Sequence, residues 1–200
     1  MDTDTSEFSI LIRYTKALST ALGYRDMMTR LHSDRVCELA MEIGVRYGLS
    51  KDDLAALRVG AAFHDIGKIG IPDHILMKPG RLDGTEWQAM KRHAEIGEKI
   101  MLSMELPGCE QAARVIRGHH EHYDGGGYPD GLSGKDIPIC ARIIAIADSY
   151  DAMAVTRSYN RAMKHHAIMD VLHSEAGAKH DPGLMPLFAS FIETSPRKAE

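Results

Sequence analysis

The chain of 200 residues is 44% hydrophobic and 26% charged, which is typical of one globular domain and not of a disordered segment. Its formal net charge of −4 argues against a nucleic-acid polymer or an anionic membrane as the main partner, but it permits a small anionic ligand. No apolar run is long enough to span a membrane, and three separated cysteines (Cys37, Cys109 and Cys140) indicate reduced thiols, so we expect a cytoplasmic protein.

The spacing of apolar residues predicts helices throughout the chain and no clear strand, repeat or domain linker. After a frayed segment over residues 1–6, we expect helices over residues 7–22, from 29 or 33 to 48, 51–65, 83–101, 107–119, 138–155, 164–177 and 181–194. Residues 67–80, with two prolines, are predicted to form a loop. The chain is therefore expected to be a single all-α domain over residues 1–200, with its core in residues 8–194.

Local signals place several helix ends. Gly23 and Gly48 are suited to end the first two helices, because glycine adopts the left-handed conformation that often follows a last turn. Capping-box patterns start two later helices, Ser50 with Asp53 and Asp83 with Glu86.

The segment Gly118–Pro129 joins two histidines to a glycine-rich turn. Three consecutive glycines disfavour continuation of the helix that carries His119 and His120, and Pro129 biases Tyr128 toward an extended conformation. The segment therefore predicts a loop whose backbone N–H groups and one tyrosine face whatever the histidines bind. Imidazoles beside such a loop suggest a metal next to a phosphate.

Other candidate ligands are weaker when each is considered alone. His64 and Asp65 close an apolar helix, which suits a divalent metal but equally suits an ordinary helix end. His32, at a helix start, and His93, on an amphipathic helix, are individually more typical of surface or packing histidines.

Asp148 interrupts the apolar run of residues 143–147, and Asp151 follows three residues later on the same helix face. A carboxylate that enters an apolar helix is costly unless it is paired or binds a metal, so a metal and a structural salt bridge are the two readings of Asp148. For Asp151, orientation of a metal ligand or a water competes with an exposed acidic residue.

Together these residues indicate a metal centre. Mixed histidine and aspartate ligands without a thiolate match iron, manganese, zinc or nickel better than magnesium. The set exceeds one tetrahedral site but suits two ions that share a carboxylate. Its members are His32, His64, Asp65, His93, His119, His120 and Asp148.

Three ordered motifs carry a resemblance to a known family. They are Phe-His-Asp-Ile-Gly-Lys-Ile-Gly-Ile-Pro at 63–72, His-His-Glu-x-x-Asp-Gly-x-Gly-Tyr-Pro at 119–129, and Ala-Arg-Ile-Ile-Ala-Ile-Ala-Asp-Ser-Tyr-Asp-Ala-Met at 141–153. Leu-Met-Lys-Pro-Gly at 76–80 and His-Asp-Pro at 180–182 add to them. From about residue 8 to 194, the chain resembles an HD-GYP domain, a branch of the HD superfamily of metal-dependent phosphohydrolases.

The resemblance implies an HD-type helical bundle with a glycine-rich GYP loop and hydrolysis of cyclic dinucleotides, chiefly cyclic di-GMP, to linear pGpG; whether the reaction then proceeds to GMP stays open. It implies a centre of two or three divalent ions, frequently iron, with manganese, nickel and zinc as other choices. By position, one ion would be bound by His32, His64, Asp65 and Asp148, and the second by Asp65, His93, His119 and His120.

The resemblance also supplies catalytic and ligand-binding candidates. Two ions about 3.5–4 Å apart would activate a bridging hydroxide for in-line attack on phosphorus. Lys68 matches the lysine that touches the scissile phosphate, and with Asp65 and Asp151 it completes the expected catalytic set. The expected substrate contacts are Lys68, Gly127, Tyr128, Arg157 and Arg161.

Departures from the family pattern qualify this picture. Met28 stands where members with three metals have a glutamate, and because a thioether is a poor ligand for a hard ion, we expect two metals. Asn160 stands where a lysine or arginine is common, and Arg161 is the expected substitute.

Alternatives to a cyclic di-GMP phosphodiesterase stay open. One is a non-catalytic sensor or protein-interaction module, and another is a phosphodiesterase for a mixed GMP–AMP cyclic dinucleotide. The intact ligand set favours an enzyme. The resemblance also suggests a receiver or sensor module, or a partner protein, as regulator, and the first helix is either a stalk for a homodimer or packs on the core.

Overall fold

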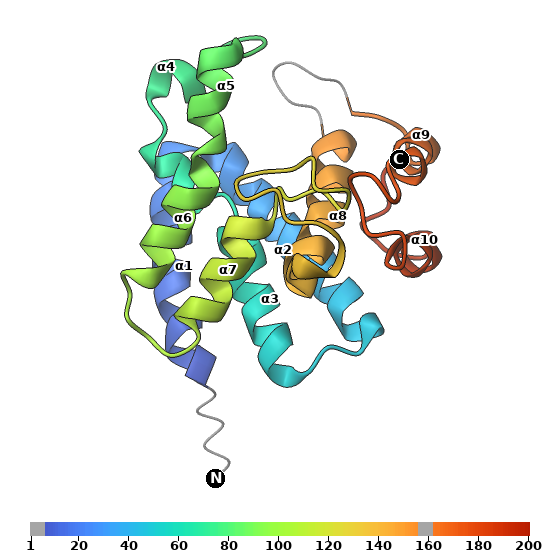
Figure 1. Cartoon of the computed structure of the whole chain (residues 1–200), viewed down its shortest axis with the longest axis horizontal. Coiled ribbons are helices and arrows are strands. Elements are labelled where there is room, and N and C mark those ends of the chain that lie inside the picture. The colour runs from blue at the N-terminus through green and yellow to red at the C-terminus, as the bar shows by residue number, and fades with distance from the viewer. Residues whose placement is uncertain (1–6, 156–161) are drawn as a thin grey trace.

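In the computed structural model of the chain, the structure describes residues 7–155 and 162–200, with side chains from residue 10 onward. The predicted all-α class is confirmed, because the described residues form helices and no strand, with one isolated β-bridge between Ala176 and His180 (Figure 1). None of the described helices is long and apolar enough to cross a bilayer. The predicted contacts at Arg157 and Arg161, and the departure at Asn160, lie outside the described residues.

The first two helices, α1 (Glu7–Arg25) and α2 (Met27–Tyr47), are separated only by Asp26. The Asp26 carboxylate accepts a hydrogen bond from the N–H of Thr29 at 3.1 Å and caps α2. The prediction that Gly23 ends the first helix is wrong. A Cβ at this position would lie 2.5 Å from the Arg30 side chain, so Gly23 makes room for that residue. The end at Gly48 is confirmed, with φ of 83° and its N–H on the Val45 carbonyl.

The third helix, α3 (Lys51–Phe63), begins where predicted, with the Ser50 hydroxyl accepting from the N–H of Asp53 at 3.1 Å. Its regular hydrogen bonding stops at Phe63, so His64 and Asp65 follow the last turn. The predicted loop over residues 67–80 is partly wrong. It contains the 3-10 helix η1 (Ile66–Gly70) and the short helix α4 (Asp73–Leu76).

The η1 segment is held from outside by the last residue of α1. The Arg25 guanidinium donates to the carbonyl oxygens of Ile69 and Ile71, the latter at 2.8 Å, and to the Asp73 carboxylate at 2.7 Å. These contacts hold the end of η1 and the residues that follow it against α1.

The helix predicted over residues 83–101 is in fact two, α5 (Gly84–Lys91) and α6 (His93–Leu102). The capping box of Asp83 with Glu86 is confirmed. The break occurs because Arg92 bonds to the carbonyl of Ala89, three residues back, while the Met90 carbonyl lies 2.8 Å from Nδ1 of His93. The side chain of His93 thus competes with the backbone for that carbonyl.

The second half follows the predicted order with small shifts at the helix ends. The helix leading to the histidines starts after Gly108 instead of at Pro107, and the last helix starts four residues later than expected. The elements are α7 (Cys109–Gly118), η2 (Gly134–Asp136), α8 (Ile139–Ala154), α9 (His165–Ser174) and α10 (Met185–Ile192).

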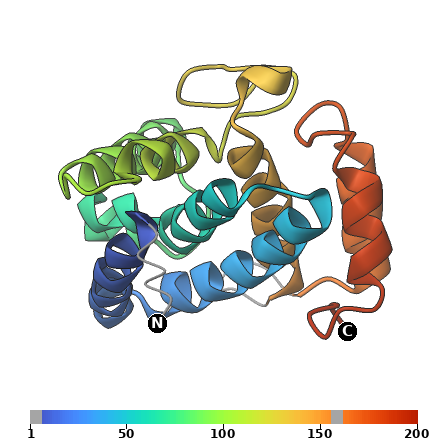
Figure 2. The same cartoon turned by 90° about the horizontal axis from the view of Figure 1, so that it is seen from below.

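Two apolar cores flank α3, which lies between them. One is formed by α2, α3 and α8 with α9 and α10, and the other by α1, α3, α6 and α7 with η1. Figure 1 shows α1, α6 and α7 on one side of the molecule and α9 and α10 on the other, and Figure 2 shows the same separation from below. Leu11 of α1 is fully buried and packs on the second core, whereas Ile12 is 38% exposed.

Close approach of two backbones joins η1 to α6. A Cβ built on Gly67 would lie 1.9 Å from the carbonyl oxygen of His93 and 2.6 Å from the amide nitrogen of Gly97. No side chain can move to relieve this overlap, because both opposing atoms belong to the backbone. Only glycine therefore allows the residues after α3 to reach His93.

We predict that Gly67→Ala lowers stability by about 1–3 kcal/mol, the usual cost of overpacking. For a domain of this size the melting temperature should fall by roughly 2–4 °C for each kcal/mol. Thermal unfolding followed by circular dichroism measures this change. Gly84→Ala is the matched control, since a Cβ there meets nothing within 4 Å. A Gly67→Ala protein with the wild-type melting temperature would contradict the packing argument.

Candidate metal centre

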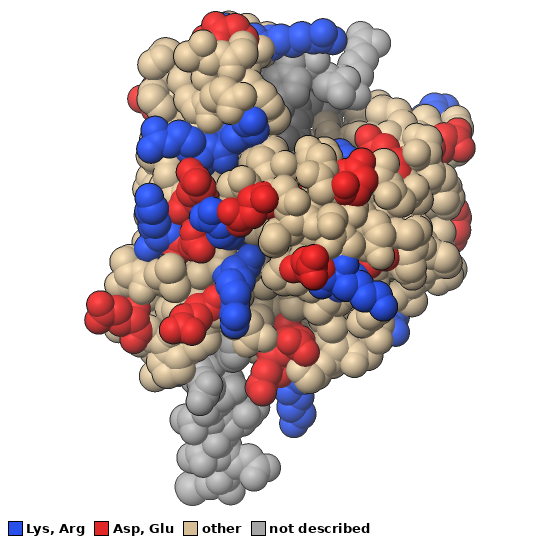
Figure 3. Space-filling model, in the orientation of Figure 1, with Lys and Arg blue, Asp and Glu red and all other residues tan. Residues whose placement is uncertain are grey.

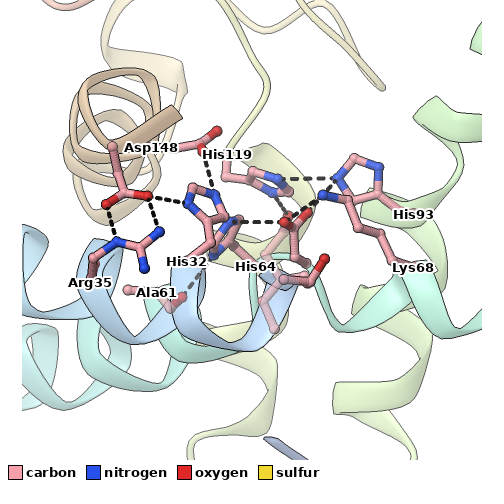
Figure 4. Close-up of polar contacts among 12 residues, drawn as sticks. His32, Arg35, Ala61, His64, Lys68, His93, His119 and Asp148 are labelled. Atoms are coloured by element: carbon pink, nitrogen blue, oxygen red, sulfur yellow. Dashed lines mark hydrogen bonds and ion pairs between the residues drawn. The ribbon is translucent and has the colours of Figure 1, made fainter. Parts of the chain in front are cut away.

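Imidazole and carboxylate groups from five parts of the chain meet between the two cores (Figure 4). The groups come from α2, the residues after α3, the first residue of α6, the residues after α7, and α8. In that order they are His32, His64 with Asp65, His93, His119 with His120, and Asp148. All seven predicted ligands thus lie together, although their role as ligands stays a prediction.

The ligand atoms form two groups of three, with Asp65 between them. Within each group the nitrogen and oxygen atoms all lie within 4.8 Å of one another; the groups are His93, His119 and His120, and His32, His64 and Asp148. Asp65 Oδ1 lies 3.5 Å from His93 Nε2, and Oδ2 lies 3.4 Å from His64 Nε2. A carboxylate in this position can contact an ion in each group.

Three imidazoles are oriented in the same way by the turn that precedes them. Nδ1 lies 2.8 Å from the Ala61 carbonyl in His64, 2.8 Å from the Met90 carbonyl in His93, and 2.5 Å from the Ile116 carbonyl in His119. A carbonyl oxygen only accepts, so each Nδ1 carries the hydrogen. Each Nε2 therefore presents a lone pair to the interior of the site.

Those lone pairs have no donor among the described residues. His93 Nε2 and His119 Nε2, both acceptors, lie 3.3 Å apart, and the buried Nε2 of His64 has no hydrogen-bond partner. Two facing lone pairs repel unless a cation lies between or beside them, and a buried acceptor without a partner costs about 1–3 kcal/mol. The donor set therefore fits divalent metal ions.

Burial keeps most of these histidines neutral. It lowers the pKa of His119 well below the usual range and that of His120 to about 3, and neighbouring imidazoles lower both further. Burial also lowers the pKa of His93, against the attraction of Asp65. Neutral imidazoles are the form that binds a metal.

Asp65 is ionised despite its burial. Burial alone would raise its pKa, but the ammonium group of Lys68 holds that pKa well below the ordinary value. Lys68 Nζ lies 2.6 Å from Asp65 Oδ2, and the lysine side chain is 20% exposed. The lysine thus reaches the edge of the site from η1, where it can face an anionic ligand.

His32 is oriented by side chains instead of a backbone carbonyl. Its Nδ1 lies 2.7 Å from Asp151 Oδ2 and its Nε2 lies 2.9 Å from Asp148 Oδ1. Burial opposes protonation, but the hydrogen bonds to Asp148 and Asp151 raise the pKa of His32 to about 9. A metal ion at Asp148 would compete with this proton.

The reading of Asp151 as an exposed residue is wrong, since it is 3% exposed. The Arg35 guanidinium holds its carboxylate through two hydrogen bonds, from Nε at 2.6 Å and from Nη2 at 2.9 Å. Sequence reasoning did not single out Arg35, although it follows His32 by one helical turn and could have been recognised as a partner for an acidic residue on this face.

The glycine-rich loop folds back onto the histidine segment. A Cβ on Gly127 would lie 2.2 Å from the amide nitrogen of His122, so only glycine allows this approach. Glu121 is 2% exposed, and its carboxylate accepts from the N–H groups of Asp130 at 2.7 Å and Leu132 at 3.0 Å. It holds the far side of the loop in place.

Tyr128 lies against the group of candidate ligands that contains His120. Its ring stacks on His120 with centroids 4.8 Å apart, and burial raises its pKa, so the hydroxyl keeps its hydrogen. Trp87 packs edge-on against Tyr128 at 6.1 Å, and Lys91 Nζ lies 5.6 Å above the same ring. Neither α5 residue was predicted to lie here, because a helical pattern does not reveal which loop covers it.

Comparison with known proteins identifies relatives with named activities. The chain is 39% identical over 165 residues to the cyclic di-GMP phosphodiesterase response regulator RpfG of Xanthomonas campestris pv. campestris, covering 82% of this chain and 44% of that protein. It is 38% identical over 178 residues to a cyclic di-GMP phosphodiesterase of Thermotoga maritima, covering 89% and 48%. It is 37% identical over 170 residues to the 3'3'-cGAMP-specific phosphodiesterase 2 of Vibrio cholerae, covering 85% and 33%. The chain thus spans less than half the length of these relatives.

Solved structures share the fold at lower identity. The cyclic GMP-AMP specific phosphodiesterase V-cGAP3 of V. cholerae superposes with a TM-score of 0.69 at 20% identity, over 92% of this chain and 49% of that one. The HD-GYP-type protein Bd1817 of Bdellovibrio bacteriovorus gives a TM-score of 0.64 at 18% identity, over 81% and 51%.

A family model that matches most of the chain identifies the family. The model of the HD domain family matches residues 16–184, which include all seven candidate ligands. This chain therefore belongs to the HD domain family, and its resemblance to the HD-GYP phosphodiesterases within that family is confirmed.

Proposed function

We propose that this chain is a metal-dependent phosphodiesterase that hydrolyses cyclic dinucleotides, cyclic di-GMP first among them. One observation carries the proposal: the Nε2 lone pairs of His93 and His119 face each other at 3.3 Å in a buried site whose central carboxylate, Asp65, contacts both groups of ligands. The relatives named as cyclic di-GMP phosphodiesterases support the choice of substrate.

The two groups of ligands would each hold one divalent ion, with Asp65 shared. Bound there, such ions lower the pKa of water to supply a nucleophile near neutral pH and polarise phosphoryl oxygens. Iron is our first choice of metal, because histidine nitrogen with carboxylate oxygen suits it, and manganese, nickel and zinc share that preference.

In hydrolysis the oxygen of water joins phosphorus and one P–O3′ bond breaks. The ribose 3′ oxygen leaves with a proton, so that cyclic di-GMP opens to linear pGpG, and a second hydrolysis of the same kind gives GMP. Lys68 is placed to neutralise charge on the phosphoryl oxygens, since its ammonium already lies against an anion at the edge of the site. Asp151, held by Arg35, orients His32.

Substrate contacts beyond the ions would come from the loop and its surroundings. The hydroxyl of Tyr128 keeps its hydrogen and can donate to a phosphate or a base. Gly127, the other contact proposed in the loop, lets the backbone that carries Tyr128 pack against the histidine segment. Arg157 and Arg161 stay predictions. On the face of the molecule in Figure 3, positive and negative side chains are interspersed, which agrees with a small ligand better than with a nucleic-acid polymer.

A second candidate substrate is the mixed GMP–AMP cyclic dinucleotide. Three V. cholerae relatives named as 3'3'-cGAMP-specific phosphodiesterases are 37%, 36% and 34% identical to this chain, close to the 39% and 38% for two relatives named after cyclic di-GMP. Overall identity therefore does not separate the two substrates.

A sensor or interaction module without catalysis is less well supported. Such a module needs a surface for its ligand but has no need for a buried set of neutral imidazoles whose lone pairs converge. Regulation by a receiver or sensor module, or by a partner protein, and assembly as a homodimer stay proposals taken from the family resemblance.

We predict that protein purified without oxygen and loaded with iron or manganese converts cyclic di-GMP to pGpG, which chromatography of the products detects. Cyclic di-AMP and the mixed dinucleotide serve as comparison substrates, and the same protein stripped by a chelator serves as the inactive control. Protein that holds two ions per chain and cleaves none of the three would contradict the proposed function.

Asp65→Ala should remove metal and activity together, because it deletes the one carboxylate that contacts both groups of ligands. We expect a loss in kcat/KM of more than about 100-fold, beyond what changes behind the ligands produce. Metal content by mass spectrometry and hydrolysis are measured on the same samples. Asp170→Ala, an exposed change on α9, is the control. Activity retained in Asp65→Ala would refute the shared position of this carboxylate.

Met28 lies one helical turn before His32 and is 52% exposed. Because its thioether is a poor ligand for a hard ion, we expect two ions per chain in the wild type. Met28→Glu should raise the content to three, whereas Met27→Glu, a neighbouring exposed methionine, should leave it unchanged. Three ions in the wild-type protein, or an equal gain in both variants, would show that position 28 does not set the number.

A further inference from the structure

A cavity of about 210 Å³ opens beside the ion ligands and runs between α8 and α9. Its lining includes the candidate ligands His119, His120 and Asp148 and, in addition, Glu175 and Lys179. It is smaller than the pockets of about 300 Å³ and more that enclose drug-sized ligands, so it suits one flat group of a ligand whose remainder lies elsewhere.

Part of the lining is small or apolar: Ala145, Ala152 and Met153 come from α8 and Val171 comes from α9. Glu121, His122 and Ser149 add polar groups to it. Alanines on one helix leave a flat gap against the next, and a methionine adapts to the shape of what enters. Such a cavity can accommodate a planar aromatic ring system between α8 and α9.

One polar part of the cavity lining is built around the carboxylate of Glu175. Its Oε2 lies 3.2 Å from Nε2 of the buried His180 and 3.6 Å from Nζ of Lys179. Burial lowers the pKa of His180 to about 4, so its ring is neutral and donates through Nε2. No hydrogen bond or ion pair to Oε1 is seen within residues 7–155 and 162–200. One oxygen is thus held, and the other is left for a ligand.

Backbone hydrogen bonds hold the segment that follows Glu175 in place relative to the metal-binding histidines. The N–H groups of Tyr123 and Asp124, in the glycine-rich loop, donate to the carbonyls of Lys179 at 3.2 Å and Ala178 at 2.8 Å. The loop that carries Lys179 is therefore fastened to the loop that follows the metal-binding histidines. These backbone hydrogen bonds therefore fix the position of Glu175 relative to the metal-binding histidines.

Resting on the proposed function, we propose that this cavity binds one base of the cyclic dinucleotide and that Glu175 with Lys179 selects guanine over adenine. One ligand can place its phosphate at the metal-binding side chains and a base in this cavity, because His119, His120 and Asp148 line the cavity together with Glu175 and Lys179. We expect Glu175 to contact the base directly, because His180 holds its carboxylate in place.

The selection follows from the edges of the two bases. Guanine presents the N1–H and N2–H₂ donors beside the O6 acceptor, whereas adenine presents an acceptor, N1, beside the N6–H₂ donor. A carboxylate accepts from both guanine donors, and an ammonium next to it donates to O6. Against adenine the same carboxylate would face the N1 lone pair. An amide in place of the carboxylate matches adenine, because it donates to N1 and accepts from N6.

The test measures binding separately from hydrolysis. Metal-loaded protein is titrated by calorimetry with the phosphorothioate analogues of cyclic di-GMP and cyclic di-AMP, which are not turned over during the measurement. We expect the wild type to bind the guanine analogue more tightly. Glu175→Gln should reduce this preference by roughly 5- to 150-fold, the range for loss of one base-reading pair. Lys179→Gln should reduce it less.

Two controls accompany these variants. Asp170→Asn removes the same charge from an exposed site on α9, the helix that precedes Glu175, and should leave the preference unchanged. Thermal unfolding should show that Glu175→Gln is folded, because glutamine keeps an oxygen for His180. The preference of kcat/KM for cyclic di-GMP over cyclic di-AMP should shift in parallel with binding.

The outcomes separate this inference from the proposed function. A Glu175→Gln protein that hydrolyses both substrates with the wild-type preference would overturn the inference and leave the function standing. Selective binding that Glu175→Gln abolishes, in a protein that cleaves nothing, would support the inference and overturn the function. Binding of neither analogue to the wild type would overturn both.

Discussion

The rest of the molecule depends on neutral imidazoles that are packed with their lone pairs toward one another. Backbone carbonyls at the ends of α3, α5 and α7 take the Nδ1 hydrogens of His64, His93 and His119, so each ring is fixed before any ligand arrives. Such an arrangement opposes folding in the absence of cations, since buried acceptors lose their contacts with water. The two apolar cores on either side of α3 must therefore supply the stability that holds the rings in place, and metal ions would add to it by binding only the folded form.

Glycines decide how closely the remaining pieces can approach these rings. Gly67 brings η1 against the backbone of α6, which places Asp65 between the two groups of ligands, and Gly127 returns the loop to the histidine segment. Arg25 and Glu121 then hold the two approaching segments from outside, through hydrogen bonds to backbone groups. The candidate ligands thus lie on helices or directly after their last turns, while the groups that would meet the substrate, Lys68 and Tyr128, lie on short segments that these contacts hold in place.

Much of this arrangement could be predicted because its signals are local. The cap at Gly48 and the capping box of Asp83 with Glu86 depend on residues within one turn, and the motifs at 63–72 and 119–129 carry most of the candidate ligands. What was missed depends on contacts distant in sequence. Asp151 is buried because Arg35, on another helix, pairs with it, and the break before His93 arises because the side chain of that residue takes a carbonyl from the backbone. No periodicity encodes either contact. The cavity beside α9 likewise brings the candidate ligands His119, His120 and Asp148 together with Glu175 and Lys179, which no sequence pattern singled out.

The choice between substrates cannot come from the ion centre, because it would contact only phosphate, which cyclic di-GMP and the mixed dinucleotide share. Overall identity to relatives named after each substrate is similar, so it does not distinguish the two. The polar part of the cavity between α8 and α9 meets the physical requirement for residues that choose the base. Glu175 is near the ligands but separate from them, and it is fixed on one oxygen by a neutral histidine. A carboxylate held in this way discriminates bases by the position of one hydrogen atom, because a base nitrogen with a hydrogen is attracted to it and a base nitrogen with a lone pair is repelled.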